Sequence, residues 1–300
     1  VLLFIATAQA ALEKSADDPD LLAENARRRT IEGKKQEALD MLEKAAAMAP
    51  ESALLTNELG EAYLDARRLD EAIATFTSAT ELDPQLYEPQ RNLAVSLLLA
   101  GRKEEASEAF RIARQMEPKD ISLYIVSSEL LLSAGRPDEA VEVLEEARTW
   151  APESAPVESQ MGLVRLRRGE NGAALEAFRK AVSLEPENPE GYNRLALGLS
   201  RAREGDCGLE AIEKALDLLP DAPHLLDSLG TVHLARGETA EAIKAYRRAI
   251  EKDPKHAVYR FNLSVALARD GEIREAERER AEAQRLDPAF EPPPDGEPVI

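Results

Sequence analysis

The chain has 300 residues, of which 44% are hydrophobic and only 4% aromatic, and its 38 basic and 57 acidic residues give a formal net charge of −19. This acidic balance argues against sequence-independent binding to nucleic acid or to anionic lipid, because positive charge drives both. Cys207 is the only cysteine, so the chain can form neither an internal disulfide nor a zinc site built from cysteines.

Residues 1–18 form a segment with two interpretations. Val1 to Ala8 is apolar, and Ala8-Gln9-Ala10 matches the small-x-small pattern of a signal-peptidase site, which indicates the remnant of an export signal and a periplasmic or cell-envelope protein. Alternatively, the segment is a helix that caps the first repeat of a cytoplasmic protein, because Ala11-Leu12 and the following EKSADDP imitate the end of the repeats described next. An apolar run this short leaves both open. No apolar run reaches the roughly 18 residues of a membrane span, so none is expected in the mature chain.

A proline returns every 34 residues along most of the chain, eight times in all. The prolines are Pro50, Pro84, Pro118, Pro152, Pro186, Pro220, Pro254 and Pro288. Alignment on them divides 19–290 into repeats 1 to 8, which span 19–52, 53–86, 87–120, 121–154, 155–188, 189–222, 223–256 and 257–290. The remaining segment, 291–300, is rich in proline and acidic, and we expect it to be extended or disordered.

Each repeat predicts two amphipathic helices joined by a short turn. Apolar residues recur at spacings of three and four, as on one face of a helix. Six of the eight turns carry glycine at position 15 of the repeat, and glycine can adopt the positive φ that ends a helix. Alanine at position 27 lets the two helices approach, and the final proline ends the second helix, because it disfavours helical geometry in the residue before it. The sequence therefore predicts sixteen helices and almost no strand.

This pattern resembles the tetratricopeptide repeat family over residues 19–290. Repeat 7 shows the motif most clearly, with Leu229-Gly230, Gly237, Ala242, Tyr246, Ala249 and Pro254. The resemblance implies an all-α fold, a right-handed α-solenoid superhelix of tandem helix-turn-helix repeats. The first helix of each pair would line the concave face and the second the convex face. Because no single repeat can bury its apolar face alone, stacked repeats share a continuous core.

Several residues depart from the repeat pattern or fill one of its slots. Trp150 takes the place of leucine or methionine at the end of a second helix, and His233 takes that of a tyrosine, so we expect both to pack in the core. In repeat 6, Gly205 is expected within a loosened turn, with Cys207 near the surface. The charged last helix, which contains Arg280, is typical of a terminal cap.

The sequence contains no motif that predicts catalysis. It has no phosphate-binding glycine loop, no G-x-S-x-G elbow and no H-E-x-x-H pair. Pairs of carboxylates are frequent, but 57 acidic residues on helical surfaces produce them by chance. We therefore predict a protein that is not an enzyme, with no catalytic residue, no metal site and no cofactor.

The resemblance places certain positions of each first helix on the concave face, where a partner would bind. In repeats 3 to 5 these positions are unusually apolar, and an exposed apolar stripe with a polar rim usually marks a partner site. An alternative for position 12, which holds Leu98, is packing between neighbouring helices. The candidate groove residues are Asn57, Glu61, Arg91, Val95, Leu98, Leu99, Ile125, Glu129, Leu163, Arg167, Asn193, Leu197 and Arg201.

Some members of the family grip the C-terminal carboxylate of heat-shock chaperones with a two-carboxylate clamp. Asn92 and Asn262 occupy the middle asparagine position of that clamp, but the lysine and asparagine required in the preceding repeat are missing. We therefore reject a chaperone clamp. The main hypothesis is a non-catalytic scaffold that binds a protein or an extended peptide on its concave face. The alternative is the regulatory or substrate-recruiting region of a larger enzyme, such as a glycosyltransferase.

Overall fold

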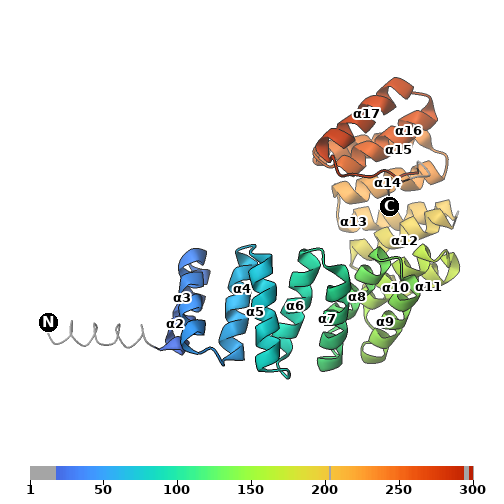
Figure 1. Ribbon diagram of the computed structural model, residues 1–300. Helices are drawn as coiled ribbons and strands as arrows, with labels where there is room; N and C mark the ends of the chain where they lie inside the picture. The colour runs from blue at the N-terminus through green and yellow to red at the C-terminus, as the bar shows by residue number, and fades with distance from the viewer. Residues whose placement is uncertain (1–17, 203, 294–296, 300) are drawn as a thin grey trace, which may run out of the picture. The chain divides into compact units, whose positions relative to one another are not determined.

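The computed structural model describes residues 18–202, 204–293 and 297–299, and over these residues the chain is helical with no strand (Figure 1). The two interpretations of the N-terminal segment depend on residues 1–17, which lie outside the described residues. The first helices of repeats 1 to 8 are α2 (Pro19–Ile31), α4 (Ala53–Asp65), α6 (Tyr87–Leu99), α8 (Ile121–Ser133), α10 (Ala155–Arg167), α12 (Pro189–Arg201), α14 (Pro223–Ala235) and α16 (Ala257–Asp270). The second helices are α3 (Lys35–Met48), α5 (Leu69–Leu82), α7 (Lys103–Met116), α9 (Pro137–Trp150), α11 (Asn171–Leu184), α13 (Gly205–Leu218), α15 (Thr239–Lys252) and α17 (Ile273–Leu286).

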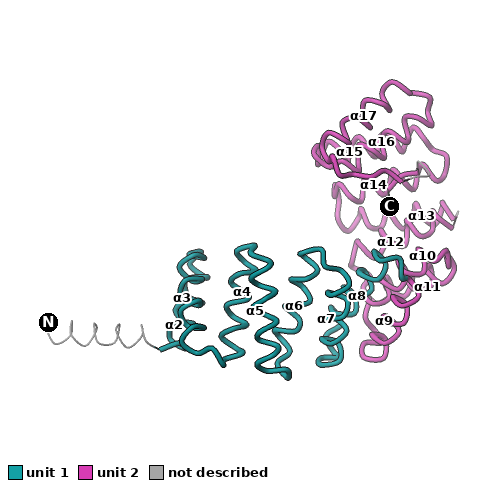
Figure 2. The backbone as a smooth tube through the Cα atoms, in the orientation of Figure 1, with its two compact units in different colours: residues 1–136 teal, residues 137–300 magenta. Residues whose placement is uncertain are grey.

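These sixteen helices confirm the predicted all-α repeat fold. Each second helix ends two residues before its predicted proline, as α3 does before Pro50. The chain divides into two compact units (Figure 2): unit 1, Val1–Arg136, contains α2 to α8, and unit 2, Pro137–Ile300, contains α9 to α17. None of the described helices is both long enough and apolar enough to cross a membrane.

The six turns that carry glycine at position 15 have the positive φ that the sequence predicts. Gly169 takes a φ of 77°, and the amide of Glu170 donates to the carbonyl of Arg165 at 2.9 Å, which closes the end of α10. In repeat 2, Arg67 holds the same position with a φ of 61°, a conformation that is less favourable for a residue with a side chain. The turns therefore reverse the chain in the same way whether or not glycine is present.

Helix contacts define the inner side of each unit. Where both helices of a repeat lie in the same unit, the first helix packs against the second, as α4 does against α5 and α14 against α15. First helices also touch the next first helix within a unit: α2 touches α4, and α12 touches α14. Second helices make no such contact with one another in the described part of the chain. First helices therefore lie closer together, so each stack curves toward them, and they form its inner face.

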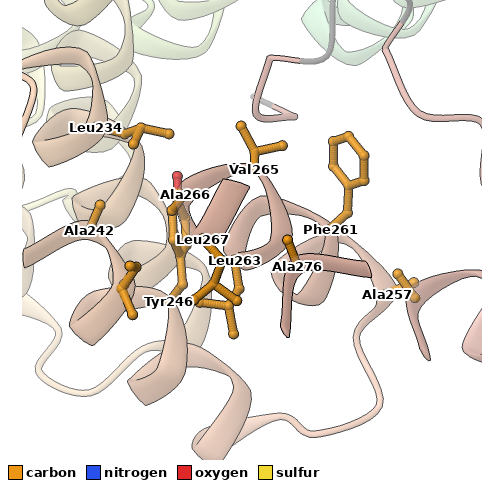
Figure 3. Packing of buried hydrophobic residues seen from close by; sticks show 12 residues of the cluster. Leu234, Ala242, Tyr246, Ala257, Phe261, Leu263, Val265, Ala266, Leu267 and Ala276 are labelled. Atoms are coloured by element: carbon orange, nitrogen blue, oxygen red, sulfur yellow. The ribbon is translucent and has the colours of Figure 1, made fainter. Parts of the chain in front are cut away.

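Small residues bring the helices together and aromatic residues fill the space between them. Ala45, Ala79 and Ala249 at position 27 are fully buried, as predicted from the sequence. Figure 3 shows this packing within α14 to α17, where Tyr246 and Phe261 belong to one buried cluster. This core fixes the first helices, which carry the candidate site.

Three expectations for single residues need correction. Trp150 is 48% exposed, because the slot at the end of a second helix is only half closed and the indole is larger than the residues it replaces. His233 is half-buried, and its Nδ1 lies 2.7 Å from Glu238 Oε2, so it joins a helix to the following turn. Gly205 begins α13 and so does not lie within the turn. Cys207 is exposed, as expected.

Part of the C-terminal segment, which we expected to be extended or disordered, packs against unit 2. Phe290 packs edge-on against Phe261, with ring centroids 5.4 Å apart. Val299 packs against the same buried cluster of α14 to α17. The described residues 291–293 and 297–299 have no regular secondary structure, so contacts with side chains hold them in place.

Candidate functional site

The predicted groove residues of unit 2 come together around one hollow of about 330 Å³ on its inner face. Leu163 and Arg167 reach it from α10, and Asn193, Leu197 and Arg201 reach it from α12. Helix α14 adds Asp227, Ser228 and Thr231, helix α16 adds Val258, and the C-terminal segment adds Val299. Four first helices of consecutive repeats therefore contribute side chains to one hollow.

Arginine dominates the charge of this surface, although the chain as a whole is acidic. A second hollow of about 630 Å³ in unit 2 shares Arg167 and Arg201 with the first and adds Arg269. Arg269 is paired with Glu297. Arg167 and Arg201 are exposed and form no ion pair with another described residue. This local excess of positive charge would attract an acidic ligand.

A buried polar pair lies on the inner face of unit 2, between α14 and α16. The Asn262 Nδ2 donates to both carboxylate oxygens of Asp227, at 3.1 and 3.0 Å. Asn262 is fully buried and Asp227 almost so. Burial raises the pKa of Asp227 to about 7, and the hydrogen bond from Asn262 opposes this rise.

The main chain of Val299 completes the hydrogen bonding of Asn262. Its N–H donates to Asn262 Oδ1 at 2.8 Å, and its carbonyl accepts from Asn262 Nδ2 at 3.2 Å. One amide side chain thus pairs with both polar groups of a single residue in an extended segment. This is the kind of contact that binds a peptide independently of its side chains.

The same spacing connects other neighbouring repeats. Asp227 is at position 5 of its repeat and Asn262 at position 6 of the next, 35 residues later. In unit 1 the corresponding Asn92 Nδ2 donates to Asn57 Oδ1 at 3.2 Å. The repeat geometry itself therefore aligns polar side chains across adjacent first helices.

In unit 1, two predicted groove residues line a hollow of about 490 Å³. Asn57 and Glu61 reach it from α4, together with Arg27 from α2 and Glu88 from α6. Glu61 Oε1 accepts hydrogen bonds from Asn57 Nδ2 and Asn92 Nδ2, each at 3.0 Å. More acidic side chains line this hollow than line either of the two hollows of unit 2.

The remaining candidates of unit 1 do not line that hollow. Val95 and Leu98 are half-buried and pack against the cluster around Phe110, so much of their surface serves the core. Leu99 is 50% exposed. Ile125 is half-buried, whereas Arg91 and Glu129 are exposed.

Sequence reasoning did not assign Asp227, Arg269 or Val299 to the site. Asn262 was recognised only as a position in a clamp that the chain lacks. The 35-residue spacing between Asp227 and Asn262, which Asn57 and Asn92 repeat, was the available signal. The contact with Val299 has no signal of this kind, because it joins the repeats to a segment outside their pattern.

The fold is a stack of paired helices, and the hollows described above lie on the side of the first helices. A family model described as tetratricopeptide repeat matches residues 32–87, 160–223 and 228–289, which together exceed half of the chain. A second model of the same description matches residues 97–161. The chain belongs to the tetratricopeptide repeat family, and its repeats support a role as a protein-interaction scaffold.

Known proteins resemble the chain mainly in fold. It is 43% identical over 61 residues to the TPR repeat-containing thioredoxin TTL4 of Arabidopsis thaliana; the match covers 20% of this chain and only 9% of that longer protein. A tetratricopeptide repeat protein from Parabacteroides merdae superposes with a TM-score of 0.65 at 17% identity, covering 86% of this chain and 98% of that one. The structure of PilF of Pseudomonas aeruginosa gives 0.53 at 22% identity, covering 67% and 92%.

Proposed function

We propose that the chain is a non-catalytic scaffold that binds an extended segment of a partner protein on the inner faces of its first helices. The observation that carries the proposal is the convergence of Leu163, Arg167, Asn193, Leu197 and Arg201 on one hollow of unit 2. The candidates of unit 1, from Asn57 to Glu129, form a second part of the proposed surface.

The chemistry of the unit 2 hollow favours an acidic partner. Leu163 and Leu197 are half-buried, so they expose apolar surface that a ligand could cover. Arg167 and Arg201 stand exposed beside them and would pair with carboxylates of the ligand. Such pairing would mainly set specificity and the rate of association.

Affinity enrichment with charge-reversal variants tests this proposal. The double variant Arg167→Glu/Arg201→Glu should recover bound partners at least tenfold less well than the wild type. The matched control is Lys214→Glu, which reverses a charge on the exposed side of the second helix α13 and should enrich the same partners as the wild type. Equal recovery by all three proteins would exclude the unit 2 hollow as the binding site.

One observation favours the alternative that these repeats recruit a substrate for a larger enzyme. The matched region occupies a small part of the plant relative, whose name describes a thioredoxin with TPR repeats. The full open reading frame decides between the two: a catalytic domain on the same chain would establish the alternative, and its absence would leave a scaffold.

A further inference from the structure

The contact between Val299 and Asn262 is specific because Asp227 fixes the orientation of the amide. The Nδ2 of Asn262 has two hydrogens, one for the Asp227 carboxylate and one for the carbonyl of Val299. The Oδ1 is left to accept from the N–H of Val299. Rotating the amide by half a turn would set Oδ1 against the carbonyl of Val299 and Nδ2 against its N–H, and the ionised form of Asp227 also disfavours that state.

Neighbouring side chains add selectivity to this main-chain contact. Two residues before Val299, the carboxylate of Glu297 pairs with Arg269 of α16. Pro298 lies between them and lines the second hollow of unit 2, that of about 630 Å³. The Val299 side chain packs against the apolar cluster of α14 to α17. The site thus accepts an acidic residue, a spacer and an aliphatic residue in extended form.

We propose that Glu297–Val299 is a tethered ligand of unit 2, and that it competes there with a partner's extended segment of the same chemistry: an acidic residue two positions before an aliphatic one. This rests on the proposed function, and it specifies which segment the inner face recognises. Binding of the partner then requires the chain's own segment to leave Asn262.

The size of the competition follows from tethering. A flexible tether holds a ligand at an effective concentration on the order of 1 mM. If the segment binds with a Kd of about 0.1 mM, the open site is about a tenth of the population, and an external peptide binds about tenfold more weakly. A tenfold difference in the affinity for the peptide can be measured by titrating the peptide with the protein.

The probe is a fluorescein-labelled peptide with the sequence of residues 291–300, EPPPDGEPVI, made as a C-terminal amide so that no terminal carboxylate contributes. Its binding to the full chain is followed by fluorescence anisotropy. Val299→Pro removes the N–H that donates to Asn262, whereas the control Val299→Ile keeps both the N–H and an aliphatic side chain. Glu297→Lys releases the segment by a second route, because it opposes Arg269.

We expect the peptide to bind Val299→Pro and Glu297→Lys chains at least tenfold more tightly than the wild type, and Val299→Ile chains within twofold of it. Adding Asn262→Ala to Val299→Pro should abolish binding. Adding Asn92→Ala, at the same repeat position in unit 1, should leave binding unchanged. Thermal unfolding of each variant shows that it is folded.

Two results would overturn the inference. Equal affinity for wild-type, Val299→Pro and Glu297→Lys chains would mean that the segment does not compete. A complete lack of binding to the released chains would mean that the site does not take this peptide. Because the probe comes from the chain itself, neither result depends on finding a partner. If affinity enrichment shows no difference between the Arg167→Glu/Arg201→Glu variant and the wild type, the peptide titration can still be interpreted by itself.

Discussion

Tyr246 lies so close to Gly230 that a β-carbon added to Gly230 would come within 2.6 Å of Tyr246 Cε1. Tyr246 is fully buried, and its hydroxyl lies 3.0 Å from Thr231 Oγ1. Gly60 and Phe76 stand in the same relationship in unit 1. Glycine at position 8 thus leaves the space that an aromatic residue at position 24 fills.

Gly230→Ala should destabilise the protein by about 1–3 kcal/mol, because the added methyl group must displace a ring held on all sides by the core. The matched control is Gly172→Ala in helix α11 of the same unit, where an added β-carbon meets nothing within 4 Å. Alanine favours helix over glycine by roughly 0.5–1 kcal/mol in a helix interior, and because Gly172 lies in the first turn of α11 the control should gain less than this. Denaturant titration of both variants measures these changes, and equal stabilities would contradict the steric explanation.

The sequence could predict features that recur in every repeat, such as the glycine at position 8, but not the docking of the C-terminal segment, which occurs once. The helices and their turns follow from apolar spacing and glycine positions within a repeat, and eight copies make this local signal unambiguous. The docking of Val299 on Asn262 depends on where a non-repeating segment meets the stack, and no periodicity encodes that. Trp150 was misplaced for a related reason: the repeat shows which slot it fills but not how open the slot is.

The candidate site was predictable to the extent that it follows the repeat. Leu163, Arg167 and Asn193 line the unit 2 hollow because their positions face inward in every first helix. In repeat 3 of unit 1, the position of Leu163 holds Val95, which is half-buried and packs against the cluster around Phe110. The position of a residue in the repeat therefore indicates which face of the helix it lies on. The packing of neighbouring side chains decides whether that residue is accessible to a ligand.

Asp227 should make the protein less stable as pH rises from about 4 to 7. Its folded-state pKa of about 7 lies above the usual aspartate value, so the folded chain holds a proton that the unfolded chain has released. Ionisation of the buried carboxyl then costs roughly 2–4 kcal/mol over this window. Asp227→Asn keeps an acceptor for Asn262 and should remove that slope.

The measurement is a denaturant midpoint at several pH values for the wild type and Asp227→Asn. The comparison is made between the two proteins because every other titratable group is common to both. The variant should be the more stable protein at pH 8, and the difference should shrink towards pH 5. Parallel curves for the two proteins would show that Asp227 does not titrate in this window.

Glu158 should stabilise unit 2 only while its basic partners are present. Its side chain is 1% exposed and accepts from Arg148 Nε at 3.1 Å and from Lys180 Nζ at 2.6 Å. Burial acts to raise the pKa of Glu158, but these hydrogen bonds outweigh it and hold the pKa below its usual value. Stability from this group is therefore present above the usual glutamate pKa and lost as pH falls through the folded value.

Arg148→Met should destabilise the protein by about 2 kcal/mol, less than the roughly 3–5 kcal/mol of a fully buried pair, because Lys180 remains and Arg148 is partly exposed. The double variant Arg148→Met/Glu158→Met should recover much of this loss, since it leaves no buried charge. Thermal and chemical unfolding at pH 7 measure both. A double variant as unstable as Arg148→Met would show that packing, and not the unpaired carboxylate, causes the loss.

Leu99→Glu separates a binding role from a structural one in unit 1. Leu99 is 50% exposed at the end of α6, so a charge there stays in water and should change stability by less than about 0.5 kcal/mol. If Leu99 forms part of the partner surface, the same change should weaken partner binding at least tenfold, which corresponds to about 1.4 kcal/mol.

The control is Val95→Glu, one turn earlier, where a charge would enter the cluster around Phe110 and lower the melting temperature sharply. A Leu99→Glu protein that is stable and binds its partner normally would exclude this end of α6 from the surface and leave the unit 2 hollow as the place to look.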